Sequence, residues 1–302
     1  MPELWPLLAA PALLLALALA AASGSAALDA RAAGSPVRVT APLAEVGGLL
    51  IQQRRSTRSA DALLWRVGGA SVVVAAILAV LVIPLGRHPI SDLSIGVVWF
   101  NAMEVVLWAW LWLTGWGANS VFGLVGGYRY VVQGLAYELP HMFALITAAL
   151  GAESLRVGAI VEAQSGLWFV VWMPAAFAIY LISALAMSFW GPFDQPVGRD
   201  LSGGVALELS GVDRLVFLGG RYLLLTVTAA MAVPLFLGGG GGPLLPDWLW
   251  SLAKTATVLG VLVWVRSRVP TVRMDRFTEV GWLVLIPVSL VQAFVVAIVV
   301  LG

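Results

Sequence analysis

Eight long apolar stretches divide the chain of 302 residues, and they constrain its fold more than any other feature. Each reaches or approaches the ~20 residues that a helix needs to cross about 30 Å of hydrocarbon. The composition excludes a water-soluble core, because 61% of the residues are hydrophobic and only 11% are charged. We therefore expect an all-α fold, a polytopic membrane helix bundle of about eight transmembrane helices that forms a single transmembrane domain over residues 1–302. The stretches are residues 4–28, 63–85, 91–114, 130–150, 167–187, 214–237, 248–265 and 280–301.

Most of the basic residues lie in every second connection between these stretches. Four alternate connections together hold eleven of the seventeen Lys and Arg residues. Basic loops stay on the cytoplasmic side of a membrane, so we expect these connections there and both termini on the outer side. The small-residue run at 21–26 leaves a second interpretation of the first stretch open, a signal-peptide cleavage site, but the basic start that such a peptide needs is missing. The basic connections are residues 29–62, 115–129, 188–213 and 266–279.

The first basic connection contains a short periodic apolar pattern. Four apolar residues recur there at helical spacing after Pro42, and this spacing predicts a short surface helix in the first cytoplasmic loop, lying along the membrane. The four residues are Leu43, Val46, Leu49 and Leu50.

The sequence offers few ligands for a metal or a cofactor. It contains no cysteine, which excludes a disulfide, a thiolate zinc site and a cysteine-held iron–sulfur cluster. His88 and His141 are the only histidines, too few for a histidine-held metal or haem. We therefore expect no metal and no other cofactor to be bound by this chain itself, and we expect redox centres in other polypeptides. The net charge of +1, spread along one membrane face, argues against nucleic acid as a partner.

Four ionisable residues lie inside the apolar stretches or at their edges. A charged side chain at the centre of a bilayer costs on the order of 3 kcal/mol. For the two basic residues, the simplest interpretation is that each reaches an interface or pairs with a neighbour for structure. The alternative is a functional pathway through the membrane. The four residues are Glu104, Glu138, Arg221 and Lys254.

Glu138 is the strongest functional candidate among them. It lies roughly two turns into the fourth apolar stretch, and its side chain is too short to reach water easily. Pro140 and His141 follow it, and a proline can open the helix backbone to water or to a partner. Because burial disfavours the charged form of a carboxyl group, a glutamate held there can take up and release protons near neutral pH. This position therefore predicts a proton relay.

Several motifs resemble one known family. The runs TGWGANS at 114–120, GLVGGYR at 123–129 and QGLAYE at 133–138 are similar, without a gap, to the third-to-fourth span region of the H subunit of the proton-pumping NADH:quinone oxidoreductase, the complex I subunit 1 family. The Pro-Phe-Asp motif at 192–194 resembles a loop motif of that family, and the last basic connection fits its pattern of arginine, proline and aspartate. The resemblance covers residues 95–301 well and the start of the chain weakly.

The resemblance implies a membrane subunit of a respiratory NADH:quinone oxidoreductase in a bacterial inner (plasma) membrane. Such a subunit links the quinone-reducing peripheral arm to proton translocation, without being catalytic alone. The implied partners are other membrane and peripheral subunits, membrane lipids, and quinone at the interface with partner subunits. The implied proton pathway comprises Glu138, Glu208 and Glu104. The implied contacts with the quinone chamber or the peripheral arm are Arg129, Asp194, Phe193, Glu45, Arg273 and Asp275.

Simpler roles remain open for two of these residues. Asp194 could cap a short helix by accepting backbone hydrogen bonds, as aspartate often does. Arg129 directly precedes the fourth predicted span, where it could contact a phospholipid or a partner protein.

The chain also departs from the family pattern. Met187 and Trp190 stand where the family has a glutamate and an arginine, and Gly48, Gln52 and Gln53 replace charged residues of the first loop. These departures keep two other functions open. One is the equivalent subunit of a hydrogenase or formate hydrogenlyase type complex. The other is a stand-alone ion transporter lined by the four ionisable residues within the spans, although the inverted repeat common in transporters is not evident.

Overall fold

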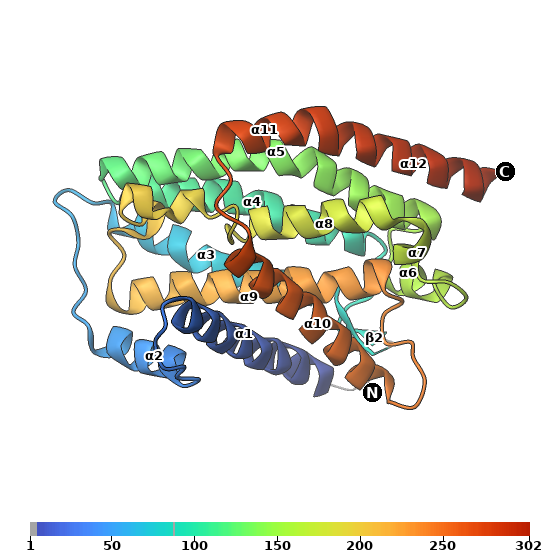
Figure 1. The fold of residues 1–302 in the computed structure, drawn as a ribbon, viewed down its shortest axis with the longest axis horizontal. Coiled ribbons are helices and arrows are strands. Elements are labelled where there is room, and N and C mark those ends of the chain that lie inside the picture. Colours follow the sequence, from blue (N-terminus) through green and yellow to red (C-terminus); the bar gives the residue numbers. More distant parts are fainter. Residues whose placement is uncertain (1–4, 87) are drawn as a thin grey trace.

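The protein is an elongated bundle of helices that run roughly side by side (Figure 1). The structure, a computed structural model, describes residues 5–86 and 88–302. In this part of the chain the strands are limited to β1 (Pro84–Leu85) and β2 (His88–Pro89), which form an antiparallel pair. The helices are α1 (Trp5–Ala32), α2 (Ala41–Ile51), α3 (Ala62–Val80), α4 (Gly96–Gly117), α5 (Val121–Gly151), α6 (Val157–Ala163), α7 (Phe169–Trp172), α8 (Pro174–Met187), α9 (Gly211–Phe236), α10 (Asp247–Arg268), α11 (Met274–Val280) and α12 (Ile286–Leu301).

Six helical segments among the described residues are long and apolar enough to cross a membrane. The prediction of an all-α polytopic membrane bundle is therefore confirmed. Of the other two predicted spans, one corresponds to α5, which has 31 residues but carries several polar side chains. The other corresponds to α7 followed by α8. The six segments are Ala9–Ala32, Ala62–Val80, Gly96–Gly117, Gly211–Phe236, Asp247–Arg268 and Met274–Val300.

The second and the fifth predicted spans are wrong in extent or continuity. The second predicted span ran to residue 85, but α3 ends at Val80 and the chain then forms β1. The fifth ran unbroken over 167–187, but it divides at Met173, because Pro174 begins a new helix and has no N–H to continue the old one.

The fourth predicted span begins nine residues too late, since residues 121–129 are helical and belong to α5. Glycine disfavours helix by local propensity, and three glycines here concealed the helix. Gly123 and Gly127 face the backbone of Gly115 and Trp112 on α4 at close range. Small residues let membrane helices approach this closely, so packing between α4 and α5 outweighs the local preference.

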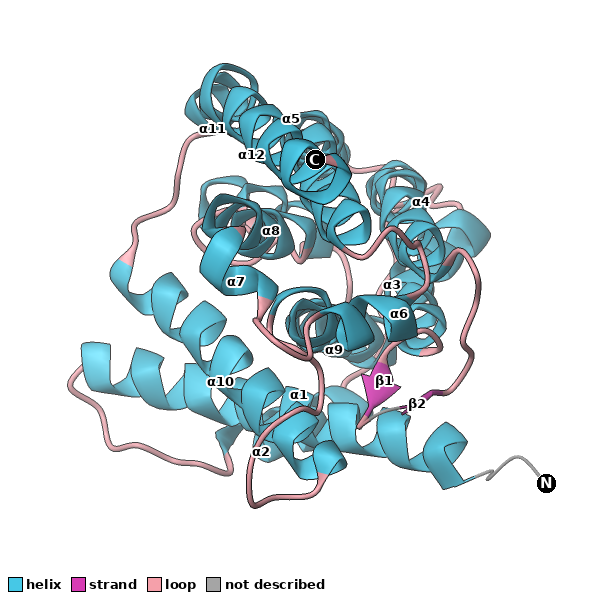
Figure 2. Ribbon diagram, turned by 90° about the vertical axis from the view of Figure 1, so that its right-hand side faces the viewer, coloured by secondary structure: helices cyan, strands magenta, loops and turns pink. Residues whose placement is uncertain are grey.

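The predicted surface helix is confirmed as α2. It lies at the edge of the bundle, where it contacts α1 and α9 (Figures 1 and 2). The segment after α2 is anchored to the start of α9. Gln52 Oε1 accepts a hydrogen bond from the N–H of Gly211 at 2.9 Å, and the N–H of Arg55 donates to Ser210 Oγ at 2.7 Å. Together these contacts hold α2 beside the first half of α9.

The two ends of the bundle are formed by different parts of the chain. Helix α1 begins and α12 ends at the same end of the bundle, while α2, the turn between α4 and α5, and the segment 188–213 lie at the opposite end (Figure 1). That segment contains three short 3-10 turns, η1 (Gln195–Val197), η2 (Arg199–Leu201) and η3 (Gly204–Ala206). The arrangement agrees with an even number of membrane crossings.

Lys254 links α10 to the segment that follows α9, at the end of the bundle where α1 begins and α12 ends. Its ammonium group donates to the carbonyl oxygens of Leu237, Gly239 and Gly241 at 2.7, 2.9 and 2.8 Å. It also lies 4.2 Å from the ring centre of Trp168. Because all three N–H donors of the ammonium group have acceptors, Lys254 ties α10 to the glycine run after α9. This is the structural role that the sequence left open.

The segment 188–213 packs directly on α5. A Cβ atom added to Gly126 would lie 2.5 Å from the backbone nitrogen of Val205 and 2.6 Å from the carbonyl oxygen of Pro196. Neither backbone atom can move away without displacing the segment. Gly126 therefore sets the distance between α5 and this loop.

Replacing Gly126 with valine is expected to force the segment 188–213 off α5 and to destabilise the protein by about 1–3 kcal/mol, the usual cost of overpacking. Thermal unfolding in detergent and limited proteolysis of the segment measure the effect. Gly260→Val is the matched control, because Gly260 is also helical and has open space around it. Equal melting temperatures for the two variants would contradict the packing argument.

Candidate functional site

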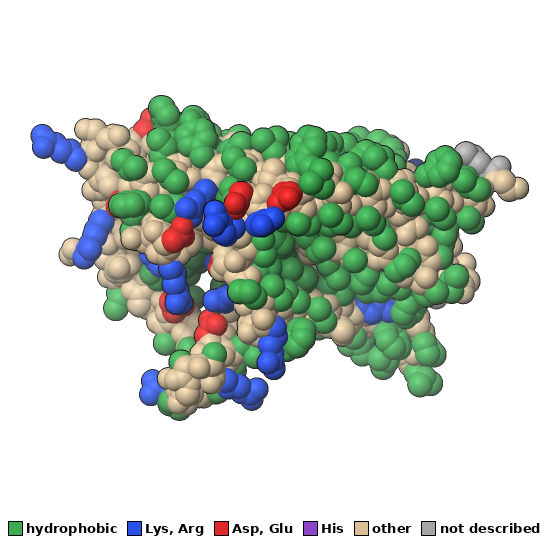
Figure 3. Space-filling model, turned by 45° about the horizontal axis from the view of Figure 1, so that its top comes forward, with side chains coloured by type: hydrophobic (Ala, Val, Ile, Leu, Met, Phe, Trp, Pro, Cys, Tyr) green, Lys and Arg blue, Asp and Glu red, His purple; other side chains and the backbone are tan. Residues whose placement is uncertain are grey.

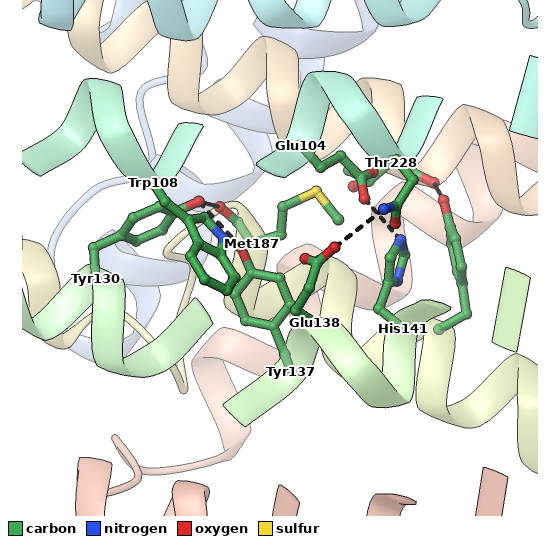
Figure 4. Close-up of polar contacts among 10 residues, drawn as sticks. Glu104, Trp108, Tyr130, Tyr137, Glu138, His141, Met187 and Thr228 are labelled. Carbon is green, nitrogen blue, oxygen red and sulfur yellow. Dashed lines mark hydrogen bonds and ion pairs between the residues drawn. The ribbon is translucent and has the colours of Figure 1, made fainter. Parts of the chain in front are cut away.

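A polar cluster is buried between α4 and α5 (Figure 4). His141 Nε2 lies 2.7 Å from Glu104 Oε2, with side chains only 0% and 2% exposed. Asn101 Nδ2 donates to Glu138 Oε1 at 3.1 Å. On each helix the two residues are three positions apart, so they share one helix face. The two faces meet and bring two carboxyl groups and an imidazole together within the bundle.

Several polar atoms of this cluster have no protein partner. Among the described residues, no hydrogen bond is made by Asn101 Oδ1, Glu104 Oε1, Glu138 Oε2 or His141 Nδ1, although all four atoms are buried. A buried polar atom without a partner costs about 1–3 kcal/mol, and ordered water commonly supplies the missing bonds. The cluster therefore has the acceptors and donors needed to hold water and exchange protons with it.

A track of polar side chains runs from the end of α8 toward this cluster. The hydroxyl of Tyr130 donates to the carbonyl oxygen of Met187 at 2.7 Å and lies 3.4 Å from the hydroxyl of Tyr137. Trp108 Nε1 donates to the same Tyr137 oxygen at 3.3 Å. Both tyrosines are fully buried, and Tyr137 directly precedes Glu138. The track thus leads along α5 from Met187, at the end of α8, to Tyr137, the residue next to Glu138 (Figure 4).

The structure brings together two of the three glutamates predicted for the proton pathway. Glu104 and Glu138 both belong to the buried cluster. Glu208 instead lies half-buried in the segment between η3 and α9, and makes no ion pair or hydrogen bond with another described residue. Among the described residues, no hydrogen bond or ion pair joins Glu208 to the cluster.

Two adjoining cavities lie at the end of the bundle formed by α2 and the segment 188–213. One, of about 480 Å³, is bounded by α1, α2, α9 and the end of α10, and the other, of about 560 Å³, is bounded by the segment 188–213 and Thr271. They share Arg199, Arg221 and Arg266 in their walls. Figure 3 shows charged side chains gathered around a hollow at this end, whereas most of the remaining face is hydrophobic.

Two of the six predicted chamber residues line these cavities. Glu45 lies in the wall of the first, and Asp194 lies in the wall of the second. Asp194 precedes η1, but its side chain makes no capping hydrogen bond, so the capping interpretation is wrong in this structure.

The other four predicted residues lie outside the cavity walls. Arg129 pairs with Asp200 at 2.7 Å and donates to the carbonyl oxygen of Gln195, so it holds the loop onto α5. Phe193 is buried against Phe277, with ring centres 4.2 Å apart. The last two predicted residues are exposed and pair with each other at 3.2 Å; they are Arg273 and Asp275.

Sequence reasoning missed several residues of the site. It gave His141 only a backbone role beside Pro140, although the three-residue spacing from Glu138 places both on one helix face. Asn101 and Glu104 have the same three-residue spacing, which places both on one face of α4. No signal in the sequence could show that the two faces meet, because that contact depends on how α4 packs on α5.

The fold and the site together define a multi-pass membrane protein with a buried carboxyl–histidine cluster and an arginine-lined cavity at one end. Three relatives bear the name of the H subunit of NADH-quinone oxidoreductase. The relative from Geobacter metallireducens is 35% identical over 271 residues, covering 86% of this chain and 82% of that protein. Those from Syntrophobacter fumaroxidans and Cereibacter sphaeroides are 33% and 37% identical, covering 84% and 72% of this chain and 80% and 69% of their own.

The model of the family described as NADH dehydrogenase matches residues 7–297. The chain therefore belongs to the NADH dehydrogenase family, in the group of membrane-embedded H subunits of NADH-quinone oxidoreductases. This confirms the resemblance that the motifs at 114–138 indicated, and other subunits of a multi-subunit complex are its partners.

Proposed function

We propose that this chain couples quinone reduction, carried out by partner subunits, to proton movement across a bacterial inner membrane. The observation that carries the proposal is the buried cluster of Glu104, His141 and Glu138, which places three proton-binding side chains within the bundle. Family membership supports the same role. The chain's own contribution is to hold and pass protons, because it contains no cysteine and only two histidines to hold a redox centre.

The cluster can pass a proton between its members. An imidazole has two nitrogens, so His141 can hold a proton at Nε2 for Glu104 while Nδ1 exchanges with water. Glu138 has one oxygen bound to Asn101 and the other without a protein partner, so it can accept a proton without breaking its hydrogen bond. The tyrosine track offers a route from the neighbourhood of the cluster to the end of α8 at Met187.

The two adjoining cavities support a quinone chamber. The first has an apolar wall that includes Leu15, Leu19 and Leu218, suited to an isoprenoid tail or a lipid chain. The second is rich in charged and polar groups, suited to a quinone headgroup. A ligand that extends through both would place its headgroup beside the segment 188–213. This segment begins directly after Met187, whose carbonyl oxygen accepts the hydrogen bond from the Tyr130 hydroxyl.

The orientation in the membrane follows from the charges. The arginine-rich connections and the cavities share one end of the bundle, and α1 begins and α12 ends at the other (Figures 1 and 3). By the positive-inside rule, the cavities face the cytoplasm and both termini face outward. Peripheral partner subunits would then dock over the segment 188–213 and the exposed pair of Arg273 and Asp275.

The two alternatives are less well supported. The relatives reported above bear the name of a quinone oxidoreductase, which favours that assembly over a hydrogenase type complex. A transporter path lined by all four ionisable residues does not fit the structure, since Lys254 is fully bound by carbonyl groups at the far end from the arginine-lined cavities.

Purification of the tagged chain from its native membrane tests the proposal. We expect a set of oxidoreductase subunits to co-purify with the tagged chain and to be identified by mass spectrometry. We also expect the complex in liposomes to move protons when NADH reduces a quinone. Co-purification with nickel-hydrogenase subunits, or ion transport by the isolated chain alone, would overturn it. The same membranes without the tag control for non-specific recovery.

A further inference from the structure

Arg221 is a cation inside α9 without a carboxylate partner. Among the described residues, no carboxylate oxygen lies within ion-pair distance of it. Its Nη2 donates to the carbonyl oxygen of Phe189, and its Nε is buried without any acceptor. A charge placed in a membrane helix is expensive unless it is paired. The free donor therefore indicates that Arg221 binds a group that is not part of this chain.

Aromatic rings hold the Arg221 guanidinium in place. It lies 4.8 Å from the ring centre of Trp190 and 5.2 Å from that of Phe189. Arg266 lies 5.2 Å from the same Trp190 ring, and is itself bound to Ser25 and to Asp29. Both guanidinium groups thus lie against the Trp190 ring, and the ring contacts hold Arg221 in place before any ligand arrives. Preorganisation of this kind lowers the cost of binding.

Arg221 stands where the two cavities join, because it lines both of them. A ligand that reaches it from the first cavity passes the apolar side chains of α1 and α9, so it needs an apolar body. At the junction it meets N–H donors, so its head needs an oxygen acceptor. Asp194 lines the second cavity only, and its carboxylate is outside ion-pair distance of Arg221.

We propose that Arg221 is a quinone-binding residue, whose free Nε–H donates to a carbonyl oxygen of the quinone headgroup at the junction of the two cavities. This inference rests on the proposed function, since it takes the chamber ligand to be a quinone. A hydrogen bond from a cation is stronger to a negatively charged oxygen, so Arg221 also favours the reduced, anionic forms of the headgroup. The phosphate of a phospholipid has the same acceptor chemistry, and the experiment separates the two.

Arg221→Gln and Arg221→Lys in the purified complex test the proposal. The first removes the charge and shortens the reach, and the second keeps the charge but removes the Nε–H. We expect Arg221→Gln to raise the KM for a soluble quinone analogue about tenfold, because a hydrogen bond from a charged group typically carries at least this much binding. Arg221→Lys should raise this KM by a smaller factor, and kcat should change less than the KM in both variants. Arg268→Gln is the matched control, an exposed arginine outside both cavities.

A photoreactive quinone gives a readout that does not depend on turnover. In the unaltered complex it should label peptides of α1 or α9, and Arg221→Gln should reduce the labelling while Arg268→Gln leaves it unchanged. Equal KM and equal labelling in Arg221→Gln would overturn the inference about Arg221 alone. Failure to label these helices in the unaltered complex would overturn the quinone chamber itself. Loss of bound phospholipid from Arg221→Gln in mass spectra, with the KM unchanged, would assign the site to a lipid phosphate instead.

Discussion

Replacing Glu138 with glutamine is expected to abolish proton translocation by the assembled complex and to leave its assembly intact. Glutamine has nearly the same shape, and its amide oxygen can still accept the hydrogen bond from Asn101. It cannot take up and release a proton near neutral pH, so the cluster loses one of its two carboxyl groups. In liposomes, we expect proton uptake per quinone reduced to fall more than tenfold, measured with a pH-sensitive dye alongside the rate of NADH oxidation.

Glu162→Gln is the matched control for this experiment. Glu162 is an exposed glutamate on α6, at the opposite end of the bundle from the arginine-lined cavities. Its replacement makes the same chemical change and should leave proton uptake as it was. If Glu138→Gln pumped protons at the unaltered ratio, the buried cluster would lose its assigned role and only a structural one would remain.

Much of the fold could be predicted from the sequence, because its physical causes are local. Apolar runs of membrane-spanning length located most helices, and helical spacing after Pro42 located α2. The errors arose where packing outweighs local preference. Residues 121–129 contain three glycines and form a helix only because α4 packs closely on them.

The candidate site was less predictable than the fold. A carboxyl group in an apolar run is visible in any sequence, so Glu104 and Glu138 were identified. The pairing of Glu104 with His141 joins residues 37 positions apart in the chain and could not be read from spacing. Glu208 was chosen by resemblance, and it lies half-buried in the loop before α9, where its pathway role stays a prediction. For Arg221 the sequence showed a buried cation, but only the structure shows the cavities that it joins.

Replacing His141 with leucine is expected to be the most destabilising single change in the site. It leaves the Glu104 carboxylate buried without its partner, and breaking a buried ion pair on one side costs about 3–5 kcal/mol. Glu104→Leu should cost a comparable amount, because it leaves the imidazole among apolar side chains and close to the ring of Tyr180. Thermal unfolding of the purified complex and the yield of assembled complex measure both effects.

The double variant separates stability from function. A buried ion pair replaced on both sides by apolar residues is often as stable as the original, so His141→Leu with Glu104→Leu should recover most of the stability lost by either change alone. It should not recover proton translocation, because neither leucine can bind a proton. A double variant as unstable as the sum of the single ones would show that the two side chains do not act as a pair. One that is stable and pumps normally would show that the pair serves packing, and the proton path would then depend on Glu138 without them.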